Sequence, residues 1–270
     1  MHFPITKVTK ITKEEFKENY YSINQPVIIK DFNQWEAFDK WRDLNFWRNN
    51  FGYRVVPIEI GRLKITGEKN WKETTMNFRE FIDGFIAPSL HQCSSNEWVP
   101  VQQEDTGKIA YLAQHSLFDQ IGELENDISV PEYCEVSSPL ANHQINEGNR
   151  FSHVKMNTWF GTHQTVTSLH YDSYDNFLTQ VFGYKYVRLY SPSQSKYLYP
   201  AHPAESGEIT SQNNISSVDL LQPDATLFPE FSNATFVDCI IAPNEMLYIP
   251  NRWWHFVQSL SPSFSLNFWF

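Results

Sequence analysis

The chain has 270 residues, of which 41% are apolar and 19% are charged, a composition that suits one globular unit with a well-packed core. Aromatic residues make up 16% of the chain, which excludes a disordered or low-complexity protein. The formal net charge is -10. Binding to nucleic acid is driven by cationic side chains that displace the counterions of the phosphates, so this charge disfavours nucleic acid and favours basic or neutral partners.

The cysteines and the N-terminus both bear on the compartment. Cys93, Cys134 and Cys239 have the spacing of neither a disulfide framework nor a zinc motif, which favours a reducing compartment. No continuous apolar segment typical of a secretion signal opens the chain, and no stretch reaches the roughly eighteen apolar residues of a membrane span. We therefore expect an intracellular protein, in the nucleus, the cytoplasm or both, without a membrane partner.

Helices and strands alternate in the first third of the chain. Thr12, followed closely by two glutamates, predicts an N-cap and the first turn of a helix. A short buried strand is expected at 26–29, and a β-rich segment at 54–61. Aromatic and apolar residues at roughly helical spacing predict helices at 39–49 and 77–85.

The rest of the chain predicts a β-barrel or sandwich. Residues 88–105 are polar and indicate a surface loop. After it, short apolar runs separated by Pro, Gly, Asn and Ser predict strands, at 109–114, 154–160, 165–172, 176–181, 184–190, 236–241, 246–249, 255–260 and 263–269. The predicted organisation is an N-terminal α+β part (1–87) packed on the barrel, a polar loop (88–108) and the barrel itself (109–270), all in one structural unit.

Two histidines and one aspartate form the first chemical signal. His170 and Asp172 are two positions apart, so on one strand both side chains would leave the same face. His255 lies on another predicted strand and would complete the set. Two imidazoles and one carboxylate on one side of an ion form the facial triad of non-haem Fe(II) sites, which leaves other positions open. Alone, a His-x-Asp pair is a weak signal, and a surface pair is the alternative.

A lysine at an apolar position forms the second signal. In the predicted strand 184–190, alternation puts Lys185 on the same face as Val187 and Leu189, where an ammonium group needs a partner. An anionic ligand would supply that partner. The alternative is an edge strand whose lysine reaches water.

Two neutral polar residues lie near the proposed ion. Thr167 precedes His170 by three positions and Asn176 follows Asp172 by four. With Lys185, they suit a dicarboxylate keto acid whose one end meets the metal and whose other end meets the cation. Separately, each residue is equally typical of an ordinary strand or turn.

Several motifs resemble those of the JmjC 2-oxoglutarate oxygenases. They are His170-x-Asp172 and the segments 176–178, 183–185, 189–192, 198–200, 249–255 and 264–269. Segments 56–61, 111–121 and 127–134 resemble one branch of that family, which hydroxylates arginine residues at C3 and was first described as a histone demethylase. The resemblance covers about residues 14 to 270. It implies a mainly β fold, a double-stranded β-helix (a cupin-like jelly roll) of eight core strands with helices packed on one side.

The resemblance also implies a co-substrate and a metal. His170, Asp172 and His255 would be the catalytic ligands of Fe(II), with 2-oxoglutarate and O2 as co-substrates. The residues that would bind 2-oxoglutarate are Tyr111, Thr167 and Lys185 at the distal carboxylate, Asn176 at the carboxylate nearest the metal, and Trp269 close to the metal site.

The same resemblance implies a pocket for the substrate arginine, lined by Glu59, Gln114 and Trp159. The chemistry of these residues agrees with that guest. A glutamate accepts two parallel hydrogen bonds from a guanidinium, a glutamine accepts another, and an indole offers a face for the planar cation. If the resemblance is set aside, Glu59 is equally a solvated strand residue and Trp159 equally a core residue.

Departures from the branch concern the mouth of the site and the ends of the chain. Ser168 and Tyr171 stand where the branch usually has Pro and Gln, so the shape of the mouth is expected to differ. Residues 88–105 have no recognised counterpart. The N-terminal helical extension of the branch and the C-terminal helices through which several JmjC proteins dimerise have no counterpart in the sequence, so we expect a monomer.

The sequence therefore predicts an Fe(II)- and 2-oxoglutarate-dependent dioxygenase that hydroxylates an arginine residue in a protein or peptide. Three alternatives remain open. A JmjC hydroxylase of another substrate, such as another protein side chain or wybutosine tRNA, is one, although the net charge of -10 opposes tRNA. A methyl-lysine demethylase is another, although no cage for methylammonium can be located in the sequence. An inactive cupin-like binding module is the third, opposed by the intact ligand trio and Lys185.

Overall fold

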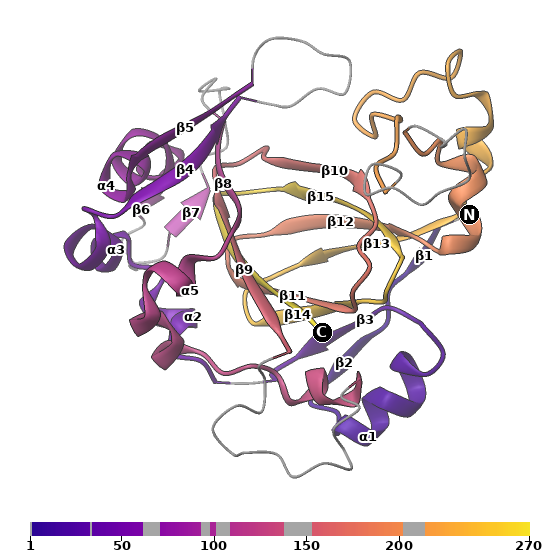
Figure 1. The fold of residues 1–270 in the computed structure, drawn as a ribbon, viewed down its shortest axis with the longest axis horizontal. Coiled ribbons are helices and arrows are strands. Elements are labelled where there is room, and N and C mark those ends of the chain that lie inside the picture. The colour runs from indigo at the N-terminus through magenta and orange to yellow at the C-terminus, as the bar shows by residue number, and fades with distance from the viewer. Residues whose placement is uncertain are drawn as a thin grey trace.

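The structure, a computed structural model, describes residues 2–32, 34–61, 71–92, 98–100, 109–137, 153–201 and 214–270. Its centre consists of two facing β-sheets (Figure 1). The smaller sheet has the strand order β1 (His2–Pro4), β13 (Phe236–Ile241), β12 (Lys185–Tyr190), β15 (Trp254–Ser259) and β10 (Val166–His170). The larger has the order β2 (Lys7–Thr9), β3 (Val27–Lys30), β14 (Glu245–Ile249), β11 (Asn176–Phe182), β16 (Ser263–Trp269), β9 (Lys155–Gly161), β8 (Ala110–His115), β4 (Val55–Ile60) and β5 (Lys72–Asn77).

The strands from β9 to β16 pass back and forth between the two sheets. The larger sheet takes β9, β11, β14 and β16, and the smaller takes β10, β12, β13 and β15. This arrangement is the double-stranded β-helix that the sequence predicted. The N-terminal strands extend the same sheets, because β3 pairs with β14 and β4 pairs with β8.

Aliphatic side chains pack together between the two sheets. Leu178, Val187, Leu247 and Val257 belong to one buried cluster there. Their alternation with outward-facing residues follows from the period of two along each strand. Towards one end of the barrel this apolar filling gives way to polar side chains, and the candidate site lies at that end.

Helices pack outside the larger sheet and explain the aromatic content. They are α1 (Lys13–Phe16), α2 (Ala37–Lys40), α3 (Leu44–Phe51), α4 (Phe78–Phe81) and α5 (Leu117–Gln120). Trp47 of α3 stacks on Phe264 of β16 with ring centroids 5.3 Å apart, and Trp41 meets the same ring at 5.2 Å. Across the described ranges, no helix is both long and apolar enough to cross a membrane.

One of two predicted helices is confirmed and the other is divided in the structure. The helix that starts at Thr12 is confirmed, and Thr12 accepts from the backbone N–H of Glu15 at 3.1 Å in a capping box. The predicted helix 39–49 is instead two helices, because the Asp43 carboxylate accepts from the backbone N–H of Asn45 and begins α3 anew. The apolar spacing continues across this break and so concealed it.

The polar segment 88–105 also differs from its prediction. Its described part contains a helical turn at Ala87–Ser89 and a hairpin of β6 (Leu90–Gln92) with β7 (Trp98–Pro100). Residues 93–97 and 101–108 lie outside the described ranges. Strand β5 was not predicted, because its residues are mostly polar and exposed at the edge of the larger sheet.

One glycine is required by the turn between β11 and β12. Gly183 has φ +74°, and a Cβ at this position would lie 2.2 Å from the carbonyl oxygen of Pro262. Another residue there would be both strained and in contact with the backbone. This close approach fixes the start of β12, and therefore the position of Lys185.

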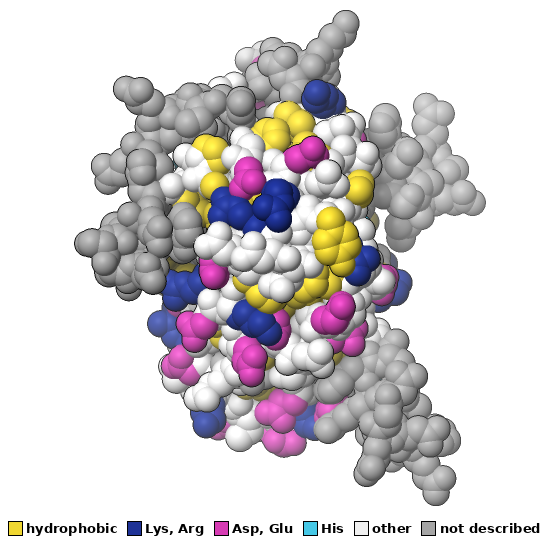
Figure 2. All heavy atoms as spheres, turned by 90° about the vertical axis from the view of Figure 1, so that its left-hand side faces the viewer, with side chains coloured by type: hydrophobic (Ala, Val, Ile, Leu, Met, Phe, Trp, Pro, Cys, Tyr) yellow, Lys and Arg dark blue, Asp and Glu magenta, His cyan; other side chains and the backbone are white. Residues whose placement is uncertain are grey.

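Charged side chains of both signs are scattered over one side of the molecule. Figure 2 shows the face that carries α3, α4, β4 and β5, where Lys and Arg side chains are interspersed with Asp and Glu. The described part of this face has no continuous basic area of the kind that binds a nucleic-acid backbone.

Candidate active site

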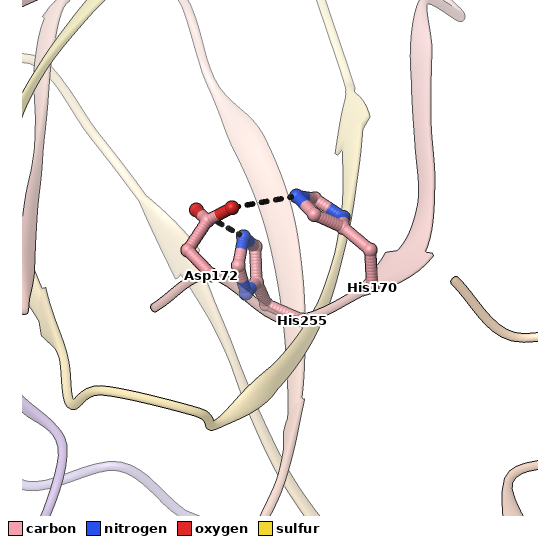
Figure 3. A group of neighbouring side chains, drawn as sticks. All are labelled: His170, Asp172 and His255. Atoms are coloured by element: carbon pink, nitrogen blue, oxygen red, sulfur yellow. Dashed lines mark ion pairs between the residues drawn. The ribbon is translucent and has the colours of Figure 1, made fainter. Parts of the chain in front are cut away.

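Three side chains of types that can ligate a metal point toward one another at the polar end of the barrel (Figure 3). Nε2 of His170 lies 3.8 Å from Oδ1 of Asp172, and Nε2 of His255 lies 3.6 Å from Oδ2 of the same carboxylate. The ligand atoms all lie within 4.8 Å of one another. The histidines meet because β10 and β15 are antiparallel and place them opposite each other. Two imidazole nitrogens and a carboxylate oxygen at this spacing suit a single ion.

The prediction that His170 and Asp172 share one strand face is wrong. Strand β10 ends at His170, and its pairing with β15 shifts register between Thr167 and His170. Asp172 lies in the following turn, where its carbonyl oxygen accepts from the backbone N–H of Arg252 at 3.0 Å. The turn before β15 therefore holds Asp172 in place, rather than the alternation of a strand.

Both histidines present a free nitrogen to the centre of the trio. Nδ1 of His170 lies 2.8 Å from the carbonyl oxygen of Ser168, and Nδ1 of His255 lies 3.0 Å from that of Trp253. Since a carbonyl only accepts, each Nδ1 carries a proton, and the other ring nitrogen, Nε2, faces Asp172. Burial, with the nearby His170, lowers the pKa of His255 well below its usual value and favours the neutral imidazole. The donor set therefore fits a divalent metal.

Lys185 is buried without a counter-ion. It is 1% exposed, and its face also carries the buried Val187 and Leu189, as predicted. Its Nζ lies 3.5 Å from the hydroxyl oxygen of Tyr111, which is hydrogen-bonded in turn to Thr167. No carboxylate in the described ranges makes an ion pair with this ammonium. Burial consequently lowers the pKa of Lys185 to about 7.

Other buried polar atoms near the trio also lack a protein partner. Oδ1 of Asn176 and Nε1 of Trp269 make no hydrogen bond with any described residue. The two residues are opposite each other on β11 and β16. The Trp269 ring is held by a stack on Tyr174, with centroids 5.5 Å apart and planes 8° apart. Unpaired buried groups of this kind indicate the place of a polar ligand.

All the predicted site residues line two cavities that share part of their walls. The larger has a volume of about 440 Å³ and the smaller about 30 Å³. The shared wall consists of Tyr111, Gln114, Trp159, Thr167, His170, Asp172 and Trp269. Lys185, Asn176 and His255 line the smaller cavity, and Glu59 lines the larger. The described lining of the larger cavity has Glu59 and Asp172 as its charged groups and includes no lysine or arginine.

Glu59 is a half-buried carboxylate that faces this cavity. It lies on β4 between Glu73 of β5 and Tyr111 of β8. Burial raises the pKa of Glu59, the nearby Glu73 raises it further, and the indole N–H of Trp71, 3.3 Å from Oε2, opposes both. A cation in the cavity would relieve this cost of burial. Trp71 was not predicted, because its contact with Glu59 depends on the pairing of β5.

Gln114 reaches the cavity from an irregular stretch of β8. Its φ is +44°, and the pairing of β8 with β9 shifts register between Leu112 and His115. A bulge of this kind turns a side chain away from the regular alternation of the strand. A left-handed conformation is uncommon for a glutamine, and it is maintained here at a cavity wall.

Asn267 is a site residue that the sequence analysis missed. It is 1% exposed, lines the smaller cavity, and its Oδ1 accepts from the indole N–H of Trp159 at 2.9 Å. The Trp159 ring also lies against Tyr111, with centroids 5.8 Å apart. Asn267 thus fixes the orientation of the indole in the cavity wall. Only the register between β9 and β16 reveals this partnership.

Ser168 and Tyr171, the two residues at which the sequence departs from the JmjC branch near the mouth, point in different directions. Ser168 lines the larger cavity. The ring of Tyr171 instead packs edge-on against Trp254, with centroids 4.8 Å apart, in a hydrophobic cluster outside the smaller sheet. Of these two residues, Ser168 is therefore the one that shapes the mouth.

Comparison with known proteins gives consistent matches over nearly the whole chain. Residues 13–270 match a family described as the cupin-like domain. The chain is 40% identical to JmjC domain-containing protein D of Dictyostelium discoideum over 93% of its own length and 53% of that protein. It is 38% identical to lysine-specific demethylase 8 of Danio rerio, over 95% of its length and 55% of that protein.

A relative with lower identity has a name that refers to tRNA modification. The tRNA wybutosine-synthesizing protein 5 of Danio rerio is 27% identical over 97% of the chain and 73% of that protein. The chain spans only about half the length of the two nearer relatives described above.

Proposed function

The chain belongs to the cupin-like JmjC family, and on that premise we propose that it is an Fe(II)- and 2-oxoglutarate-dependent dioxygenase that hydroxylates an arginine residue in a protein. The observation that carries the proposal is the buried Lys185, which has no counter-ion among the described residues, in a cavity wall that also holds His170, Asp172 and His255. A metal and a dianion together would satisfy every one of these groups. The compartment we propose is intracellular, nuclear or cytoplasmic, and the state monomeric.

His170, Asp172 and His255 would hold the iron through two Nε2 atoms and one carboxylate oxygen. When bound, Fe(II), 2-oxoglutarate and O2 would supply the oxidising chemistry and the oxygen atom of the new hydroxyl group. The protein's own part is to orient both imidazoles through the carbonyls of Ser168 and Trp253, so that each Nε2 faces the place of the ion.

Lys185 would pair with the distal carboxylate of 2-oxoglutarate, with the hydroxyls of Tyr111 and Thr167 as further partners. These three groups already form one connected cluster. Asn176, whose Oδ1 is unpaired, would use its amide at the carboxylate nearest the metal, and the indole of Trp269 would close that side. Such an arrangement would hold the co-substrate at both ends.

The binding of 2-oxoglutarate is expected to weaken as pH rises above about 7. The pKa of Lys185 in the free protein is about 7, below its usual value, so the ammonium is present below that pH and is lost above it. A bound carboxylate favours the charged form, and binding at higher pH must therefore take up a proton, with affinity falling by up to about tenfold per pH unit. Calorimetry at about pH 8 in two buffers of different ionisation enthalpy measures this uptake. Affinity that is constant across this range, without proton uptake, would contradict the assignment of Lys185.

Glu59, Gln114 and Trp159 would bind the substrate guanidinium. A carboxylate whose burial is uncompensated gains most from a cation that offers two parallel N–H groups. The indole that Asn267 orients offers its face to the same planar group.

Replacing Glu59 by glutamine should reduce peptide hydroxylation by about tenfold or more, because a bidentate ion pair becomes neutral hydrogen bonds and one amide N–H faces a donor. Uncoupled 2-oxoglutarate turnover should persist. Glu73→Gln is the matched control, since Glu73 lies directly opposite Glu59 on β5 and is exposed. Hydroxylation is followed by mass spectrometry of an arginine peptide and of the same peptide with lysine. Equal turnover of both peptides, or no effect of Glu59→Gln, would rule out the arginine assignment.

Demethylation of methyl-lysine is the second candidate function, and one feature of the cavity favours it. The rings of Trp159 and Tyr111, with the half-buried Glu59, also suit a methylammonium group. A relative described as a lysine-specific demethylase adds to this candidate. Parallel assays separate the two, because hydroxylation adds about 16 Da to an arginine peptide and demethylation removes about 14 Da from a methyl-lysine peptide.

The remaining alternatives have less support. A tRNA substrate is opposed by the net charge of -10. An inactive binding module is opposed by the trio and Lys185, which would both be costly to keep without a ligand.

A further inference from the structure

Strand β10 is the last strand of the smaller sheet, and one of its edges is largely open (Figure 1). On one side it pairs with β15. On the other, the backbone N–H of Ser216 donates to the Leu169 carbonyl at 2.8 Å, and that of Tyr171 donates to the Asn214 carbonyl at 2.9 Å. These bonds cover the end of the strand only. Nothing in the described ranges pairs with its outer edge before Leu169.

The backbone groups of this open edge point away from β15. The carbonyl oxygen of Thr165 faces β15, because it accepts from the backbone N–H of Ser259 at 2.9 Å. In a trans peptide the next N–H points the opposite way, so the N–H of Val166 points outward. The pairing with β15 stays in register through Thr167, so alternation points the Val166 carbonyl outward and the Thr167 carbonyl toward β15. The N–H that follows the Thr167 carbonyl, that of Ser168, points outward in turn. The open edge therefore offers donor, acceptor and donor in sequence.

This edge forms a wall of the larger cavity. Gln164 and Thr165 of the preceding turn line it, and so do three consecutive residues of the strand, Val166, Thr167 and Ser168. Side chains of a strand alternate between two faces, so a consecutive run lines one cavity only where the cavity runs along the strand's edge. The same cavity is lined by His170, Asp172 and Glu59. The open edge and the metal-binding trio thus belong to one continuous space.

We propose that the edge of β10 at Val166–Ser168 binds the main chain of the substrate as an added strand. This rests on the proposed action on a protein substrate. A substrate residue opposite Thr167 shares the face of Thr167, which points into the barrel toward Tyr111. That residue would be the target arginine. Its two neighbours point away from the barrel, so recognition next to the arginine uses the main chain more than the side chains.

Proline substitutions at the edge test this docking. Val166→Pro and Ser168→Pro each remove one outward N–H, and proline is tolerated at strand edges where its N–H would face away from the sheet. Val166→Ala and Ser168→Ala are the matched controls, because they shorten the side chain and keep the N–H. Each proline variant should bind a fluorescent arginine peptide at least about tenfold more weakly than its alanine partner, by anisotropy. Thermal unfolding and Mn(II) titration of all four variants check that the fold and the metal site persist.

A scan of the peptide provides a second, independent readout. Single N-methyl groups are placed along the backbone on either side of the arginine. An added strand alternates inward and outward N–H groups, so binding and KM should be sensitive at every second position. The docking proposal is overturned if the proline and alanine variants bind the arginine peptide equally well. It is also overturned if N-methyl groups weaken binding without alternating along the peptide.

Two further outcomes are distinguishable. A concentration-dependent dimer in light scattering that Val166→Pro dissociates would assign the edge to a second copy of the chain, and would overturn the proposal. Peptide binding that alternates without any hydroxylation would support the docking while the proposed reaction fails. Hydroxylation with unchanged KM in both proline variants would overturn the docking alone.

Discussion

Asp172→Ala is expected to abolish 2-oxoglutarate turnover while leaving the fold largely intact. The substitution removes the charged member of the trio, and two neutral imidazoles alone bind a divalent metal poorly. The backbone carbonyl that accepts from Arg252 is unchanged, so the turn that carries the residue should keep its position. Succinate release and anaerobic Mn(II) titration measure the two losses.

A second carboxylate from the same turn supplies the control. Asp175 accepts from the hydroxyl of Tyr248 at 2.6 Å and from the backbone N–H of Asn251 at 3.1 Å. Asp175→Asn should therefore lower the melting temperature but keep Mn(II) binding, the reverse of Asp172→Ala. Wild-type succinate release by Asp172→Ala would remove the basis of the metal assignment.

Lys185→Met should weaken 2-oxoglutarate binding by about 2 to 5 kcal/mol, the range for truncating one partner of a buried charge pair. Methionine keeps most of the volume but leaves the distal carboxylate beside Tyr111 and Thr167 without a cation. Metal binding should survive. The melting temperature of the free protein should rise, because a buried ammonium without a counter-ion costs more than a thioether.

Calorimetry with 2-oxoglutarate separates this role from a structural one. Lys196→Met is the control, since Lys196 is exposed and lies over the ring of Tyr197. It should bind 2-oxoglutarate as the wild type does. Unchanged affinity in Lys185→Met would leave the co-substrate assignment without its main support.

Local patterns predicted the core strands and the buried lysine, while the choice of a double-stranded β-helix over a sandwich came from the resemblance to the JmjC oxygenases. Short apolar runs bounded by turn residues gave the core strands, because burial between two sheets requires them. Period-two alternation alone placed Lys185 among Val187 and Leu189, and the structure buries all three. These features depend on neighbours along the chain, so the sequence specifies them directly.

Features that depend on pairing between distant segments could not be predicted. Asp172 joins the trio through a turn that Arg252 holds, not through the strand that its spacing indicated. The left-handed backbone of Gln114 follows from a bulge in β8. Asn267 meets Trp159 only through the register of β16 on β9. Register and bulges arise from the whole sheet, so no local pattern reports them.

The most direct test of the proposed reaction is the mass of an arginine peptide after incubation with the protein, Fe(II), 2-oxoglutarate and O2. We expect a gain of about 16 Da on the arginine, rising to about 18 Da under isotopically heavy O2, because the new oxygen atom comes from O2. Succinate should form in equal amount, and Asp172→Ala should give neither product. An unchanged arginine peptide, alongside a methyl-lysine peptide that loses about 14 Da, would contradict the proposal and establish the demethylase instead.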